Sequence, residues 1–249
     1  MSEPLRLLRD SFPGRPSFGS AVSDAILHRV AAGELPATLR LHRPGRELAF
    51  SKQDRAASGF ARALDAARAA GFEPVLRLAG GRAAAFHEGT LALAYATPAR
   101  YPQRTTRQRF ELVAGVIADA LRDLGVDARV GEVPGEYCPG AWSVNARGRV
   151  KLAGIGQRLI AGGAHAGVVV VAAGSALLRE ALEPVYAALA LEWDPRTAGA
   201  IEDELPGITL GDVEEALLAQ LGRRFELEPA ALDPATLARA RELEAGHRL

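Results

Sequence analysis

The chain has 249 residues, of which 30 are basic and 30 acidic, so its formal net charge is zero. This balance argues against a protein whose main role is to bind nucleic acid or an anionic membrane surface. Hydrophobic residues make up 48% of the chain, enough for a sizeable core, and a single cysteine excludes an internal disulfide and fits a reducing cytoplasm.

The apolar segments are too short to indicate membrane insertion. No long apolar stretch follows the charged residues at the N-terminus, so we expect no secretory signal. The longest strongly apolar run, residues 164–178, contains a histidine and two glycines and is shorter than a bilayer-spanning helix. We therefore expect a cytoplasmic protein.

The first predicted elements alternate between extended and helical segments. Residues 1–20 mix proline, glycine and charge, and we expect them to be extended. Ser20 or Ser23 is a good N-cap for a helix that ends near Gly33. Residues 38–43 alternate apolar and polar side chains, which predicts a half-buried strand.

A second helix and two short strands follow. Ser51 is a suitable N-cap for a helix over residues 52–70, which Gly71 ends. Residues 74–78 and 90–96 are rich in apolar residues and are predicted strands.

The central region contains the clearest helix of the chain. Residues 104–125 place apolar side chains at the 3.6-residue period and end at a glycine. Residues 127–131 follow as a strand, and residues 142–145 and 150–160 are predicted to form a hairpin. The run of valines within residues 166–173 predicts a buried strand.

The C-terminal part is predicted to be helical. Amphipathic patterns cover residues 210–221 and 234–244, and a linker near residues 202–207 separates them from the preceding chain. We therefore expect a catalytic domain over residues 1–205 and a short helical extension over residues 206–249.

Cys138 lies in the turn-forming sequence Gly135-Glu136-Tyr137-Cys138-Pro139-Gly140. A thiolate is a strong nucleophile, and turn residues favour an accessible thiol that could carry a covalent acyl intermediate. A small buried apolar residue is the alternative, and the local sequence leaves both open.

Lys151 is one of two lysines in a chain that otherwise uses arginine. An ammonium group near the loop would lower the pKa of the thiol or bind the oxygen of a thioester carbonyl as it gains charge. A solvated position on a strand is the alternative.

Paired glycines follow the strand at residues 74–78, with Arg77 before Gly80 and Gly81 and with His87 after them. Glycines permit close approach of the backbone to a ligand, whereas His87 is either a base or a structural hydrogen-bonding residue. The chain has no phosphate-binding loop, no dinucleotide fingerprint and no metal-ligand spacing, so we predict no metal.

Together these segments resemble the lipoate–protein ligase and octanoyltransferase family. The glycine-pair signature corresponds to Arg77, Gly80, Gly81 and His87, and the lysine signature corresponds to Lys151-Leu152-Ala153-Gly154-Ile155-Gly156-Gln157-Arg158. The resemblance covers roughly residues 20–200. It implies an α/β (α+β) fold with a mixed, largely antiparallel sheet flanked by helices, like that of biotin and lipoate ligases and class II aminoacyl-tRNA synthetases.

Cys138-Pro139-Gly140, just before the lysine signature, is most similar to the cysteine-dependent transferases that move octanoyl from the glycine cleavage H protein to other lipoyl domains. The resemblance implies that Cys138 carries octanoyl or lipoyl as a thioester and that Lys151 binds the acyl carbonyl oxygen. Arg77, Gly80, Gly81, His87, Gly154 and Gln157 would bind the substrate. No cofactor is consumed, because a thioester already stores the required free energy.

Two other functions stay open. An ATP-dependent lipoate or biotin ligase would use Lys151 on an acyl-adenylate, although Leu78-Ala79 replaces a second arginine that is frequent in ligases. A non-catalytic acyl-chain or carrier-binding protein would retain the fold without turnover. A cysteine hydrolase that pairs Cys138 with His87 is less favoured.

The expected partners are lipoyl-domain proteins, namely the glycine cleavage H protein and the acyltransferase subunits of 2-oxoacid dehydrogenases, with acyl carrier protein as another donor. Neither nucleic acid nor membrane is an expected partner. Arg104, Arg107 and Arg109 would meet an acidic lipoyl domain, but an ordinary solvated helix face explains them better.

Overall fold

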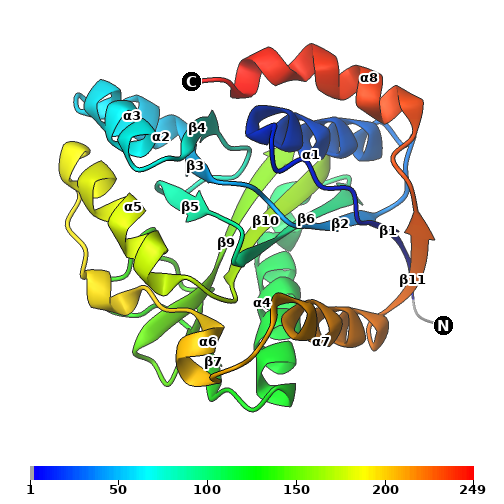
Figure 1. Cartoon of the computed structure of the whole chain (residues 1–249). Coiled ribbons are helices and arrows are strands. Elements are labelled where there is room, and N and C mark those ends of the chain that lie inside the picture. The colour runs from blue at the N-terminus through cyan, green and yellow to red at the C-terminus, as the bar shows by residue number, and fades with distance from the viewer. Residues whose placement is uncertain (1–2) are drawn as a thin grey trace.

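The computed structural model describes residues 3–249, which form two β-sheets enclosed by helices (Figure 1). The large sheet has eight strands in the order β11-β1-β2-β6-β10-β9-β8-β7. In chain order they are β1 (Glu3–Leu8), β2 (Thr38–His42), β6 (Thr90–Ala99), β7 (Ala128–Val130), β8 (Val144–Ala146), β9 (Val150–Ile160), β10 (Gly162–Val171) and β11 (Phe225–Ala230). Within this sheet only β1 pairs in parallel, with β2 and β11, so the predicted mixed and largely antiparallel sheet is confirmed.

The small sheet has three strands in the order β4-β3-β5. They are β3 (Glu47–Phe50), β4 (Glu73–Leu76) and β5 (Ala84–Phe86). β4 leads directly into the segment with the paired glycines, and β5 follows it, so this sheet anchors both ends of that segment.

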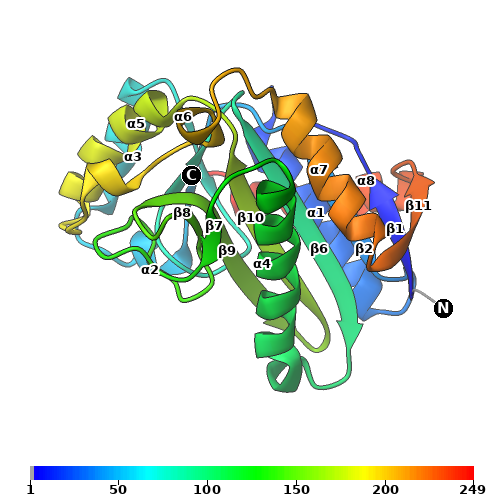
Figure 2. The same cartoon turned by 90° about the horizontal axis from the view of Figure 1, so that it is seen from below.

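Helices cover both faces of the large sheet. They are α1 (Pro16–Ala31), α2 (Lys52–Arg55), α3 (Phe60–Ala69), α4 (Thr106–Asp123), α5 (Ser175–Ala188), α6 (Ile201–Glu204), α7 (Leu210–Gly222) and α8 (Pro234–Leu243), with 3₁₀ helices η1 (Pro102–Thr105), η2 (Pro195–Thr197) and η3 (Glu244–His247). Figure 2 shows α4 and α7 lying together across one face. The small sheet with α3 and α5, and α1 with α8, lie on the other.

The apolar period of α4 explains its place in the core. Val113, Ala114, Ile117 and Leu121 are buried against the large sheet and α7. The predicted helix therefore forms, although its first residues belong to η1. Gly125 follows it with a φ of 102°, a conformation that glycine adopts without strain.

Two of the predicted helix limits are wrong. Ser20 and Ser23 lie inside α1, because Pro16 already supplies the fixed φ that suits a first helical position. The predicted helix over residues 52–70 is broken into α2 and α3. Ser51 and the side chain of Asp54 cap α2 reciprocally, and the chain restarts as α3 where it packs closely on the end of α5.

The prediction of a purely helical C-terminal extension misses β11. This strand extends the large sheet in parallel with β1, from Glu3 opposite Phe225 to Leu8 opposite Ala230, and α8 packs on α1. The expected extended N-terminal segment likewise contains β1. Both strands depend on pairing between segments more than 200 residues apart, which local patterns do not encode.

Candidate active site

A cavity of about 530 Å³ lies between the large sheet and the small sheet. The segment with the paired glycines and the loop around Cys138 form its walls, and strands β2, β6, β9 and β10 form its floor. Five of the six predicted substrate-binding residues line this cavity, together with both predicted catalytic residues. They are Arg77, Gly80, Gly81, Gly154, Gln157, Cys138 and Lys151.

Small side chains leave room above the floor. Gly156 on β9 lies opposite Gly167 on β10, which in turn lies opposite Ala94 on β6. A Cβ atom on Gly156 would stand 2.9 Å from the carbonyl oxygen of Gly80, closer than real contacts allow. The glycine at this position therefore lets the wall approach the floor.

The loop fixes Cys138 in an unusual backbone conformation. Its φ is 44°, which non-glycine residues rarely adopt. The backbone N–H of Cys138 donates to the hydroxyl of Tyr186 (2.9 Å), and this hydroxyl donates to the carbonyl oxygen of Ala83 (2.9 Å). A buried side chain of α5 thus holds the nucleophile candidate in a strained backbone, as is frequent at functional sites.

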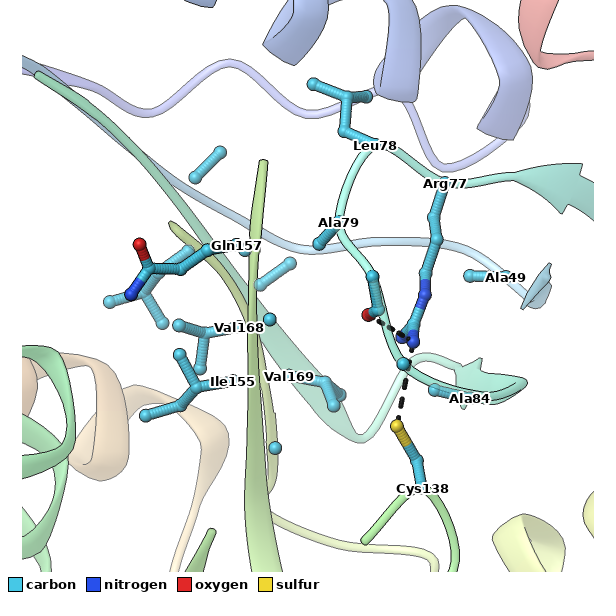
Figure 3. A pocket seen from close by; sticks show the side chains of 18 of the residues that line it. Ala49, Arg77, Leu78, Ala79, Ala84, Cys138, Ile155, Gln157, Val168 and Val169 are labelled. Carbon is cyan, nitrogen blue, oxygen red and sulfur yellow. Dashed lines mark hydrogen bonds between the residues drawn. The ribbon is translucent and has the colours of Figure 1, made fainter. Parts of the chain in front are cut away.

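Two donors approach the sulfur of Cys138. The backbone N–H of Arg82 lies 3.1 Å from Sγ and Nη2 of Arg77 lies 3.6 Å from it, as Figure 3 shows for the arginine. Burial raises the pKa of the thiol. The charges of Arg77 and, to a smaller extent, Lys151 lower it by more, so the pKa lies below its ordinary value. A lowered pKa enriches the thiolate, which is the reactive form.

Gly81 permits this approach. A Cβ atom at Gly81 would overlap Nη2 of Arg77 and would lie 2.8 Å from Sγ of Cys138. Nη2 of Arg77 also donates to the carbonyl oxygen of Gly80 (2.6 Å), which keeps the guanidinium over the paired glycines. The glycine pair therefore makes room for the arginine and the thiol to meet.

Lys151 is buried beneath the loop rather than free in the cavity. Its Nζ donates to the carbonyl oxygens of Cys138 (2.7 Å) and Tyr137 (3.0 Å) and to Oε1 of Glu136 (3.1 Å). These three acceptors match the three hydrogens of an ammonium group. Lys151 thus ties down the Cys138 turn and brings a positive charge near the thiol.

Glu136, which was not among the predicted site residues, organises the loop. Its Oε1 accepts from Lys151, from the hydroxyl of Ser143 (2.6 Å) and from the backbone N–H of Gly140 (3.0 Å), and its Oε2 accepts from the N–H of Val133 (3.1 Å). The available signal was an acidic residue two positions before the cysteine, in a segment otherwise composed of turn residues.

Gln157 connects the glycine pair to α4. Its carbonyl oxygen accepts from the N–H of Gly80 (3.2 Å). Its side chain donates to the carbonyl oxygen of Thr106 and accepts from Arg109, each over 2.9 Å. Arg109 is thereby buried, and it is not part of the exposed basic face that we expected, whereas Arg107 is exposed and paired with Glu111.

The structure does not bring His87 into the cavity. His87 directly follows β5, and its buried ring packs against Gly89 and Gly174. Its Nδ1 accepts from the N–H of Gly89 (3.0 Å). The contacts are those of a structural histidine at the end of a strand, and they do not form a base beside Cys138.

Within residues 3–249, no three histidine, cysteine or acidic side chains gather as a metal site would need. No helix in this part of the chain combines the length and apolar character of a bilayer-spanning helix.

Curated relatives share the sequence pattern over most of the chain. An octanoyl-[GcvH]:protein N-octanoyltransferase of Geobacillus kaustophilus is 27% identical over 210 residues, which cover 84% of this chain and 72% of that protein. A protein of the same name from Anoxybacillus flavithermus is 30% identical over 168 residues, which cover 68% of this chain and 59% of that protein.

Solved structures share the fold. A lipoate-protein ligase A bound with ATP superposes with a TM-score of 0.76 at 19% identity, over 98% of this chain and 95% of that one. A bi-partite lipoate protein ligase of Thermoplasma acidophilum, studied with its E2 lipoyl domain, gives 0.76 at 19% identity, over 98% and 92%. The sequence profile of the lipoyl protein ligase A/B catalytic domain matches residues 15–222, and the chain therefore belongs to that family.

Proposed function

We propose that the chain is an acyltransferase that carries an octanoyl group on Cys138 and passes it to a lysine of a lipoyl domain. The observation that carries the proposal is the position of Sγ, which lies at the cavity wall with the N–H of Arg82 and the guanidinium of Arg77 as its donors. The names of the octanoyltransferase relatives support octanoyl as the acyl group and the glycine cleavage H protein as a partner.

The first step would form the thioester. The thiolate of Cys138 attacks the acyl carbonyl of the donor, a new carbon–sulfur bond forms, and the donor's lysine amine leaves with a proton. Where the donor is itself a thioester, a thiol leaves instead. Arg77 stabilises the thiolate before attack, and the small side chains of the floor, among them Val169 and Ala94, would surround the chain.

The second step would release the group. The ε-amine of the acceptor lysine attacks the thioester, an amide bond forms, the carbon–sulfur bond breaks, and the thiol of Cys138 regains a proton. With an amide donor the net reaction exchanges one amide for another, and with a thioester donor the thioester supplies the free energy, so we propose that no nucleotide or other cofactor is consumed. We also propose that the reaction takes place in the cytoplasm, where a lone thiol stays reduced.

Lys151 acts on this reaction mainly through the loop. All three of its acceptors belong to residues 136–138, so binding an acyl carbonyl oxygen would require it to release one of them. We propose that it positions Cys138 and adds to the positive charge that lowers the pKa of the thiol.

Intact mass spectrometry with an octanoylated H protein tests the proposal. An octanoyl adduct should form on the wild-type chain, disappear in Cys138→Ala, and decay when an unmodified lipoyl domain is added. An adduct that persists in Cys138→Ala would exclude this nucleophile. Release of pyrophosphate with free octanoate or lipoate and ATP would instead identify a ligase.

A further inference from the structure

One end of the cavity carries polar side chains beside the ring of Phe12. Beyond the small residues of the floor it is lined by Arg40 and His42 on β2, by Glu47 on β3 and by His165 on β10. An octanoyl chain ends in a methyl group, which forms no hydrogen bond or ion pair with such side chains. This polar end is therefore not explained by the proposed substrate.

Strand register places Arg40 across the floor from β9, the strand whose Lys151 holds the Cys138 loop. Gly156, Gly167, Ala94 and Arg40 lie opposite one another across β9, β10, β6 and β2. Neighbouring strands are about 4.8 Å apart, so Arg40 lies roughly 14 Å across the floor from β9. Cys138 lies at the β9 side, where Lys151 binds its carbonyl oxygen.

Arg40 carries a buried charge without a counterion. Its side chain is fully buried, and it donates to the carbonyl oxygens of Asp10 (2.9 Å) and Gly19 (2.8 Å) and to the hydroxyl of Ser23 (3.1 Å). Its Nη2 has no hydrogen-bond partner, and no carboxylate of residues 3–249 forms an ion pair with it. An unpaired buried cation is costly to a fold.

The ring of Phe12 faces the guanidinium at 5.4 Å, and the charges of Glu47 and Asp10 act on it without forming an ion pair. Burial raises the pKa of Glu47 to about 8, against the charge of Arg40, which lowers it. Burial lowers the pKa of His165 to about 4 and that of His42 well below its ordinary value, so both rings are neutral. The Nδ1 atoms of the two histidines also lack hydrogen-bond partners.

We propose that the polar end binds a carboxylate at the far end of the acyl chain, so that the enzyme accepts monothioesters of medium-chain dicarboxylic acids. A carboxylate would supply the counterion that Arg40 lacks, and it would accept hydrogen bonds from the guanidinium and from the histidine rings. This inference rests on the proposed function, because it assumes that the chain starts from Cys138.

Two thioesters of N-acetylcysteamine test the inference, since they differ only at the far end of an eight-carbon chain. One carries octanoyl, and the other carries 7-carboxyheptanoyl. In both reactions the acyl carbon–sulfur bond to Cys138 forms while the bond to N-acetylcysteamine breaks, and the released thiolate takes up a proton. Initial rates of adduct formation on the full chain are read by intact mass, with Cys138→Ala as the background.

The wild-type chain should react with 7-carboxyheptanoyl at least as fast as with octanoyl. In Arg40→Gln the ratio of the two rates should fall about tenfold, which corresponds to about 1.4 kcal/mol of transition-state stabilisation. The octanoyl rate of each variant serves as its own reference for folding and access.

A second pair of variants avoids removing Arg40, whose contacts also hold the backbone at Asp10 and Gly19. Ala94 lies directly opposite Arg40, so Ala94→Asp would place a carboxylate within reach of the guanidinium, while Ala94→Asn has the same size without the charge. The rate ratio should fall in Ala94→Asp relative to Ala94→Asn.

The outcomes separate the two proposals. Failure of both thioesters to acylate Cys138 would overturn the proposed function. Suppose that octanoyl acylates Cys138 but the 7-carboxyheptanoyl rate stays below about one tenth of the octanoyl rate in both wild type and Arg40→Gln. That result would overturn only the carboxylate site. Equal rate ratios in Ala94→Asp and Ala94→Asn would overturn it as well.

Discussion

Lys151 and Glu136 form a buried ion pair inside the loop that carries Cys138. Nζ lies 3.1 Å from Oε1, and the lysine and glutamate side chains are 1% and 0% exposed. The same ammonium holds the carbonyl oxygens of Tyr137 and Cys138. The pair therefore determines the shape of the loop as well as its charge.

Removing Lys151 should destabilise the fold as well as slow acylation. Lys151→Met leaves Glu136 buried without its cation, which costs about 3–5 kcal/mol in comparable pairs. The double variant Lys151→Met/Glu136→Gln removes both charges and should recover part of that loss. Urea unfolding measures the free energies. A double variant as unstable as the sum of the single variants would contradict the coupling.

Arg77→Met should make the thiol less acidic. The charge of Arg77 lowers the pKa of Cys138 more than any other group does, so its removal should raise the pKa and decrease the thiolate fraction at neutral pH. The pH profile of Cys138 alkylation by iodoacetamide should move to higher pH, with a several-fold lower rate at pH 7. Arg107→Met, which removes an exposed arginine of α4, should leave the profile in place.

The two adjacent glycines should differ in their tolerance of alanine. Gly81 has a φ of 104°, and a Cβ atom there would overlap Arg77 and Cys138. A Cβ atom at Gly80 would instead meet only the carbonyl oxygen of Gln157, at 4.0 Å. Gly81→Ala should therefore cost about 1–3 kcal/mol of stability and most of the acylation rate. Gly80→Ala is the matched control. Equal acylation rates in the two variants would show that the close approach is dispensable.

His165 should make stability depend on acidic pH. Its pKa is about 4 in the folded chain and 6.5 for a free histidine side chain, so the unfolded chain binds more protons between these values. Stability from a neutral His165 is complete above pH 6.5 and falls as the pH drops toward 4, by about 3 kcal/mol in total. As the pH drops from 6.5 toward 4, the free energy of unfolding of His165→Gln should rise relative to that of wild type by about 3 kcal/mol. Urea unfolding at several pH values measures this difference. A stability difference that stays constant with pH would contradict the depressed pKa.

Local patterns predicted most of the central elements. The apolar period of α4, the hairpin turn before β9 and the run of valines in β10 are local features, because each depends on residues close together in the sequence. β1 and β11 escaped prediction because each is stabilised by a partner at the other end of the chain. The break between α2 and α3 depends on packing against α5.

The sequence by itself determined which residues are candidates for the chemistry. The only cysteine, one of two lysines and the paired glycines are distinctive as residue types, and their order along the chain indicated the family. Only the tertiary structure decided how they meet. It brought Arg77 to the sulfur of Cys138, left His87 outside the cavity, and directed Lys151 onto Glu136 and the loop carbonyls. Distances between side chains on separate strands follow from sheet register and loop conformation, which long-range packing sets.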